Sequence, residues 1–171
     1  MSAYEQLVRA HQATALRVAY LVTGDKGEAE DITQDAFINA YRALPRFDEG
    51  RPFRPWLLTI VRNLARNRRR RSGRQAALRL RVASLEASGE AAPSPEDMAL
   101  STTEAEMLLA AVDALPEKYR LVIGLRYLVG LSERETAETL DVPVGTVKSR
   151  TARALDQLKT DMTTSQARNM P

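Results

Sequence analysis

Residues 131–158, LSERETAETLDVPVGTVKSRTARALDQL, constrain the fold more than any other part of the chain. Ser132 and Glu135 have the spacing of a capping box, which predicts that a helix begins after Ser132. Asp141, Val142 and Pro143 then predict a break, because proline cannot continue a helix but is suited to open the next one. Two helices joined by a three-residue turn are the sequence pattern of a helix-turn-helix.

The helix expected after Pro143 has an apolar stripe and a polar, cationic face. The stripe at helical spacing consists of Val144, Val147, Thr151, Ala154, Leu155 and Leu158. The polar face, with its flanks, consists of Thr146, Lys148, Ser149, Arg150 and Arg153. Such side chains are suited to base edges and phosphates in the DNA major groove. The alternative is an ordinary two-helix corner with a solvated charged face.

Three details favour the DNA-binding interpretation over the ordinary corner. Ala137 is small where the two helices must cross, Val147 follows ten residues later where the second helix returns to the core, and the turn is short. One position departs from the usual pattern, because Asp141 stands where such turns normally carry glycine. Aspartate tolerates the left-handed conformation better than most residues, so we expect the turn to form.

Charge is strongly segregated along the chain behind a net charge of +3. Residues 51–81 contain 11 arginines and no acid, whereas residues 82–117 contain 8 acids and no base. An arginine block without acids repels itself, which predicts a polyanionic partner. The acidic block is expected to avoid that partner.

Composition excludes several kinds of chemistry. The chain has no cysteine and a single histidine, His11, so disulfides and thiolate chemistry are excluded and little remains for a metal site. His11 is expected in the core or an interface. No apolar run has membrane-spanning length and the N-terminus lacks the pattern of a signal peptide. We therefore expect a cytoplasmic protein without membrane insertion, metal or cofactor, and without catalytic activity.

The rest of the chain shows helical periodicity and no strand pattern. Helices are expected over residues 4–22 and 25–44, from Pro55 onward, and over residues 103–115 and 116–130. We predict an all-α fold of two small helical domains, residues 1–75 and 102–160. An acidic, flexible linker is expected over residues 76–101, and residues 161–171 form a tail.

Two helix faces outside the helix-turn-helix are candidate binding surfaces. The second helix turns Asp31, Gln34, Asp35 and Ile38 away from its apolar stripe. This face is either an ordinary solvent-exposed surface, whose acids are favourable near the positive N-terminal end of the helix dipole, or an acidic docking surface with Ile38 as its apolar anchor. The helix after Pro55 has an outer face of Arg62, Asn63, Arg66, Asn67 and Arg70, opposite a buried face that includes Trp56. The asparagines add hydrogen-bonding capacity suited to bases or sugars.

Three stretches together resemble the bacterial extracytoplasmic-function sigma factors, the two-domain specificity subunits of RNA polymerase. They are GDKGEAEDITQDAFINAYRAL, FRPWLLTIVRNLARNRRRR and ALPEKYRLVIGLRYLVGLSERETAETLDVPVGTVKSR, and the resemblance covers nearly the whole chain. Members of that family usually carry alanine at the position of Pro55 and an aliphatic residue at that of Thr136. The main rival is a helix-turn-helix regulator that does not join polymerase, and an enzyme is a weaker one.

The resemblance implies separate binding roles for the two domains. Residues 1–75 look like the σ2 domain, in which Asp31, Gln34, Asp35 and Ile38 would bind the clamp of core RNA polymerase. The loop around residues 47–49 would receive a base flipped from the melted −10 strand. The residues implied in −10 binding are Phe47, Asp48, Arg54, Arg62, Asn63, Arg66, Asn67 and Arg70. Residues 102–160 look like the σ4 domain, whose Thr146, Lys148, Ser149, Arg150 and Arg153 would read the −35 element of promoter DNA. An anti-sigma factor is a further expected partner.

Overall fold

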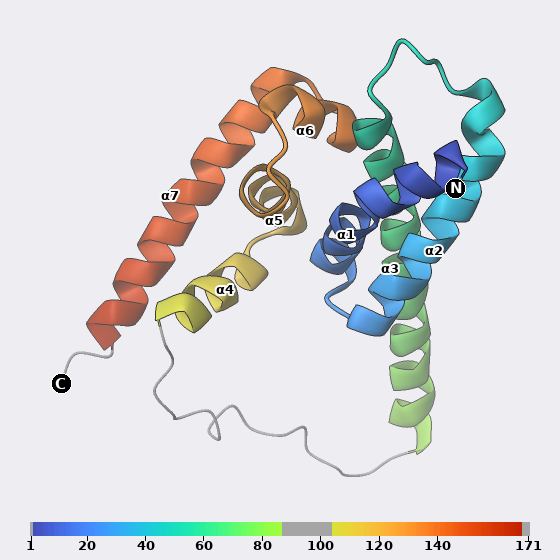
Figure 1. Cartoon of the computed structure of the whole chain (residues 1–171). Coiled ribbons are helices and arrows are strands. Elements are labelled where there is room, and N and C mark those ends of the chain that lie inside the picture. The colour runs from blue at the N-terminus through green and yellow to red at the C-terminus, as the bar shows by residue number, and fades with distance from the viewer. Residues whose placement is uncertain (1, 87–103, 169–171) are drawn as a thin grey trace.

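The computed structural model describes residues 2–86 and 104–168, and all the regular structure in those ranges is helical (Figure 1). The helices are α1 (Ala3–Thr23), α2 (Lys26–Ala43), the short 3₁₀ turn η1 (Leu44–Arg46), α3 (Phe53–Glu86), α4 (Glu104–Ala114), α5 (Glu117–Ile123), the π-helical turn η3 (Gly124–Leu128), α6 (Glu133–Leu140) and α7 (Val144–Arg168). The prediction of an all-α fold is confirmed.

The N-terminal half is a three-helix unit in which α1, α2 and α3 pack against one another. Apolar positions repeat at helical spacing, so α1 buries Val18, α2 buries Ile32 and α3 buries Leu57 and Val61 in a common core. The expected first two helices agree with α1 and α2 to within one residue at each end. The start of α1 is fixed by a capping box that was not predicted, in which Ser2 and Glu5 exchange side-chain-to-backbone hydrogen bonds.

Helix α3 is longer at both ends than expected. It begins at Phe53, two residues before Pro55, because a proline is tolerated in the first turn of a helix. It continues to Glu86, so residues 76–86, which were assigned to the linker, are helical in this structure, and the linker assignment itself stays a prediction. The sequence QAALRLRVASLE consists mostly of good helix formers and contains no proline. The remainder of the predicted linker up to Ser101, and residues 169–171 of the tail, lie outside the described residues.

The C-terminal half is built from α4 to α7, with α4, α5 and α6 all packing on α7. Leu115, Ile123, Ala154 and Leu158 form a small apolar cluster of their own. The helix expected over residues 116–130 differs from expectation in its second part. Residues 124–128 adopt a π turn that is capped by Val129, and Gly130 follows with a left-handed φ of 75°.

The two halves are in contact in this structure. Helix α3 packs on α6, and α1 packs on α5 and η3 (Figure 1). Leu57, Leu58 and Val61 of α3 belong to the same buried cluster as Leu121 of α5 and Leu140 of α6. The division into two separate domains therefore remains a prediction, while the contact between them has consequences for the candidate site.

Candidate nucleic-acid interface

The helix-turn-helix is formed by α6, a three-residue turn and α7. Its first helix is fixed by the predicted capping box, in which the Ser132 N–H donates to Glu135 Oε2 over 2.8 Å and the Glu135 N–H donates to Ser132 Oγ over 3.1 Å. At its end Asp141 adopts the left-handed conformation, with φ 53° and ψ 53°. The Val142 N–H then reaches the carbonyl of Ala137 over 3.0 Å. The expectation that Asp141 would take the position of the usual glycine is confirmed.

The crossing of α6 and α7 is close, as predicted from small side chains. Ala137 is 3% exposed and Val147 is 0% exposed. The predicted apolar stripe of α7 is only partly right, because Val144 and Leu155 are exposed. At about 100° per residue these two lie roughly 60° and 80° from Val147 around the helix axis, at the edge of the buried stripe.

The predicted DNA-reading residues of α7 lie on its outer side. Lys148, Ser149 and Arg153 are exposed, whereas Thr146 and Arg150 are half-buried. Ser149 Oγ donates to the Thr146 carbonyl over 3.1 Å, and Lys148 Nζ lies 3.7 Å from Glu133 Oε2. Both contacts are local and solvent-exposed, so a DNA ligand can replace them at little cost.

The predicted face of α3 is divided between solvent and the C-terminal half. Asn63 and Asn67 are exposed, but Arg62 is only 8% exposed, so its placement on the outer face of the helix is wrong. It borders a hollow that is also lined by Leu121 of α5 and Leu140 of α6. Its guanidinium donates to Asn63 Oδ1 from Nη2 over 2.9 Å and from Nε over 3.2 Å. Burial, followed by the neighbouring charge of Arg66, lowers the pKa of Arg62. An arginine nevertheless keeps its charge.

Two other predicted arginines, Arg54 and Arg66, contact the C-terminal half, and so does Arg69, which was not among the predicted residues. Arg66 Nε lies 3.2 Å from Glu117 Oε1, and Arg69 Nη1 donates to the other carboxylate oxygen over 3.1 Å. Arg54 Nη2 donates to the Val129 carbonyl over 3.0 Å. Arg70 is exposed and borders the same shallow hollow as Arg66, Arg69 and Glu117. The role of Glu117 was not predicted, because it is the contact between the halves that brings this residue to α3.

The loop before α3 is anchored by aromatic rings. Phe47 is half-buried, with its ring centroid 4.6 Å from that of Trp56 and 5.9 Å from that of Phe53. Asp48 is exposed, and its Oδ1 accepts a hydrogen bond from the Gly50 N–H over 3.0 Å. Trp56, which was expected on the buried face of the helix, is half-buried and packs against the core.

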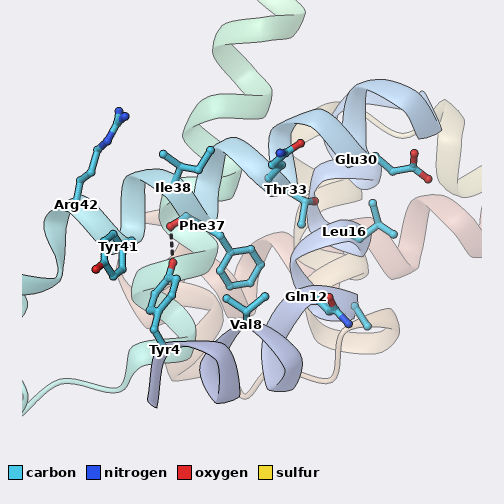
Figure 2. A pocket seen from close by; sticks show the side chains of 12 residues that line it. Tyr4, Val8, Gln12, Leu16, Glu30, Thr33, Phe37, Ile38, Tyr41 and Arg42 are labelled. Carbon is cyan, nitrogen blue, oxygen red and sulfur yellow. Dashed lines mark hydrogen bonds between the residues drawn. The ribbon is translucent and has the colours of Figure 1, made fainter. Parts of the chain in front are cut away.

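The acidic face of α2 lies beside an apolar groove. Asp31, Gln34 and Asp35 are exposed, and Ile38 is 42% exposed. Gln34 and Ile38 also border a groove of about 960 Å³ between α1 and α2 (Figure 2). Its apolar lining comes from Tyr4, Val8, Leu16, Phe37, Ile38 and Tyr41, and the Tyr4 hydroxyl donates to the Phe37 carbonyl at its floor.

This groove was not predicted, although the sequence contains a pattern that indicates it. Tyr4, Val8 and Leu16 repeat at helical spacing on α1, beside the stripe that faces the core. Burial raises the pKa of the Tyr4 hydroxyl, which therefore stays protonated and able to donate. An apolar groove next to exposed acids and an exposed isoleucine has the composition of a protein-binding surface.

Other kinds of site receive no support from the part of the chain that the structure describes. Within residues 2–86 and 104–168, no three histidine, cysteine or acidic side chains are grouped closely enough to hold a metal ion. Over the same ranges, no helix combines the length and apolar character needed to span a membrane. His11 is half-buried, as expected, with its ring 5.4 Å from that of Phe53. Burial and the nearby Arg54 lower the pKa of His11.

Two known protein families match the chain, one in each of its two helical halves. The family described as Sigma-70 region 2 matches residues 7–75, which include α1, α2 and the first part of α3. The family described as Sigma-70, region 4 matches residues 105–158, which include the helix-turn-helix.

Three curated proteins are similar along most of the chain. The ECF RNA polymerase sigma factor SigW of Bacillus subtilis is 36% identical over 166 residues, covering 92% of this chain and 87% of that protein. The ECF RNA polymerase sigma-E factor of Escherichia coli K12 is 35% identical, covering 86% and 79%. SigE of Mycolicibacterium smegmatis is 34% identical over 93% of this chain, which spans 61% of the length of that protein.

Two solved structures share the fold. The sigma factor RpoE of Bartonella quintana, in complex with the anti-sigma factor NepR, aligns with a TM-score of 0.72 at 23% identity over 95% of this chain and 98% of its own. CnrH, in complex with the cytosolic domain of CnrY, aligns with a TM-score of 0.66 at 29% identity over 92% and 86%.

Proposed function

This chain belongs to the extracytoplasmic-function group of the sigma-70 family. From that membership we propose which of its helices act in each part of transcription initiation. Its function is that of an RNA polymerase sigma factor, which directs promoter-specific transcription. The observation that supports this most strongly is the match of both sigma-70 regions, in order, to the two helical halves. Catalysis stays with the polymerase, and the chain contributes binding surfaces in the cytoplasm, where the DNA is.

Helix α7 is the proposed reader of the −35 element. Ser149 and Arg153 are exposed one turn apart on its outer side, and Lys148 flanks them. An arginine that donates two hydrogen bonds to a guanine edge discriminates between bases, whereas lysine mainly contacts phosphate. Thr146 and Arg150, at the margins of this face, complete the proposed contact.

Helix α3 and the loop before it are the proposed holders of the melted −10 strand. Asn63 and Asn67 offer exposed amides, and Arg54, Arg62, Arg66 and Arg70 offer positive charge to the phosphates. The loop residues Phe47 and Asp48 are the proposed border of the pocket that takes a flipped base. Single strands suit such a face, since their bases are free to stack on rings and to hydrogen-bond through their edges.

Helix α2 is the proposed docking surface for core polymerase. Asp31 and Asp35 supply negative charge for a basic partner surface, while Gln34 and Ile38 lead into the apolar groove. Acidic residues around an apolar anchor give an interface both orientation and contact area. An anti-sigma factor is the second proposed protein partner, since two sigma factors of the same fold are known in complex with partner proteins.

Promoter-directed transcription with purified core polymerase tests the proposal. The wild-type chain should support initiation, and Asp35→Arg should lower its affinity for core polymerase in a pull-down. Asp161→Arg on α7 makes the same change of charge away from α2 and is the matched control. If Asp35→Arg bound polymerase as tightly as this control, the docking assignment would be wrong. If the wild-type chain neither bound polymerase nor initiated transcription, the alternative of an independent DNA-binding regulator would be favoured.

A further inference from the structure

A hollow of about 480 Å³ lies where α3, α5, α6 and α7 meet, and cations dominate its lining. Arg62 and Arg66 come from α3, Lys118 from α5 and Arg150 from α7. Glu117 is the one acid among the nine lining residues, so four cations against one acid leave a formal excess of three positive charges. Charges of one sign around a concave surface concentrate the electric field there and attract an ion of the opposite sign.

Arg62 carries a buried charge without a counter-ion. It is 8% exposed, and both of its hydrogen bonds go to one neutral acceptor, Asn63 Oδ1. No carboxylate in the described ranges forms an ion pair with it. Asp141 and Glu117 raise its pKa by less than burial and Arg66 lower it, so these acids compensate its charge incompletely. A buried charge is costly unless an opposite charge is paired with it, which makes an anion the missing partner.

The other cations of the hollow are one paired arginine and two unpaired side chains. Arg66 is paired with Glu117, whose second carboxylate oxygen binds Arg69, so this acid is already neutralised. Arg150 is half-buried and Lys118 is exposed. Within the part of the chain that the structure describes, neither of these two side chains forms an ion pair or donates a hydrogen bond. Both are therefore available to an anion in the same hollow as Arg62.

The hollow also has an apolar part and room for more than a simple ion. Leu121 of α5, Leu140 of α6 and Val142 of the turn line it together with the cations. Its volume falls within the range of small-molecule sites, roughly 300–1,000 Å³. Arg66 also borders a second hollow that Arg69 lines, so positive charge continues beyond the first. A flat apolar group joined to a chain of negative charges matches this lining, and that is the composition of a nucleotide.

We propose that this hollow binds a nucleoside polyphosphate, with the phosphates on Arg62, Arg150 and Lys118 and the base against the apolar residues. Arginine binds phosphate oxygens in pairs through its planar fork, and lysine binds them as a point charge. The same arginines, with Arg66, are proposed to contact promoter DNA. A bound nucleotide occupies these groups, so promoter binding should weaken as the nucleotide concentration rises. This consequence rests on the proposed function, whereas the binding site does not.

Isothermal titration calorimetry of the full chain with ATP and GTP measures binding directly. The buffer contains no divalent cation and about 0.15 M salt, at which diffuse attraction between exposed charges is screened. One nucleotide should bind per chain. Inorganic triphosphate should bind about tenfold more weakly, because it buries no base, and adenosine should not bind. No saturable binding of either nucleotide would overturn the proposal. Triphosphate binding as tight as that of ATP would overturn the assignment of a nucleotide.

Variants from two different helices locate the site. Arg62→Met and Arg150→Gln should each weaken ATP binding about tenfold or more, because each loses hydrogen bonds from a charged group. Arg71→Gln is the matched control, since Arg71 is an exposed residue of α3 that does not line the hollow. An equal loss of affinity in Arg71→Gln would show diffuse attraction to the arginine-rich helix and would overturn the proposed site.

Thermal melts separate a lost site from a lost fold. ATP should raise the Tm of the wild type and of Arg71→Gln, because a ligand that binds only the folded chain stabilises it. The Tm of Arg62→Met should not respond to ATP, although this variant melts cooperatively without it. An equal rise of Tm in Arg62→Met would overturn the assignment of the phosphates to Arg62. Failure of the proposed function has a different signature, because the chain would then bind ATP with this pattern and still not initiate transcription with core polymerase.

Discussion

Thr136 offers a test of how tightly the helix-turn-helix is packed. It is 0% exposed on α6, and its hydroxyl is buried without a hydrogen-bond partner. A buried polar group without a partner costs about 1–3 kcal/mol. Valine has nearly the same shape and a similar helix propensity, so Thr136→Val removes the penalty without changing the packing. We expect the free energy of unfolding to rise by about 1–2 kcal/mol, and Tm by roughly 2–4 °C for each kcal/mol in a chain of this size.

Urea unfolding followed by circular dichroism measures this change, provided that the two proteins unfold with the same denaturant slope. Thr151→Val is the matched control on α7. Its hydroxyl donates to the Val147 carbonyl over 2.8 Å, so the same substitution there removes a satisfied group and should be neutral or destabilise by up to about 1 kcal/mol. If Thr136→Val were no more stable than wild type, or lost more stability than the control, the penalty assigned to this hydroxyl would be refuted.

Three further outcomes are expected. Asp141→Gly should stabilise the chain by about 0.5–1 kcal/mol in the same unfolding assay, because Asp141 has a left-handed φ of 53° that glycine adopts without strain. The pKa of His11 is lower in the folded chain than in the unfolded chain, so the unfolded chain takes up the proton at a higher pH. The free energy of unfolding should therefore be at its full value above pH 6.5 and fall as the pH drops below that value. His11→Gln should reduce this fall, as measured by thermal melts. Arg153→Ala should weaken promoter binding by about 1–3 kcal/mol at one base position, whereas an equal loss on every sequence in a binding-site selection would show that Arg153 contacts only phosphate.

The sequence was most informative where local chemistry decides the structure. The capping box at Ser132, the left-handed Asp141 and the buried Val147 all follow from interactions within a few residues or along one helix face. The start of α2 is likewise set locally, since the Asp25 side chain accepts from the Glu28 N–H over 2.7 Å. The predicted exposed acids of α2 were likewise found at the surface.

The sequence was least informative where distant segments meet. An arginine-rich helix face by itself predicts exposure to solvent, and nothing near Arg62 in the sequence indicates that it will be buried beside α5 and α6. Glu117 looked like one acid of an acidic block, yet it contacts Arg66 and Arg69 some 50 residues earlier. Helix α3 runs past the predicted domain end at residue 75 for another reason, because residues 76–86 consist mostly of good helix formers.

The ring contact between Phe47 and Trp56 gives the protein an optical probe of its own. Trp56 is the single tryptophan of the 171 residues, and its ring centroid lies 4.6 Å from that of Phe47 in the loop proposed to take a flipped base. Its emission therefore comes from one defined place beside that loop. Any displacement of Phe47 on strand capture should change the colour or yield of this emission, so the loop can be followed in the unlabelled protein in real time.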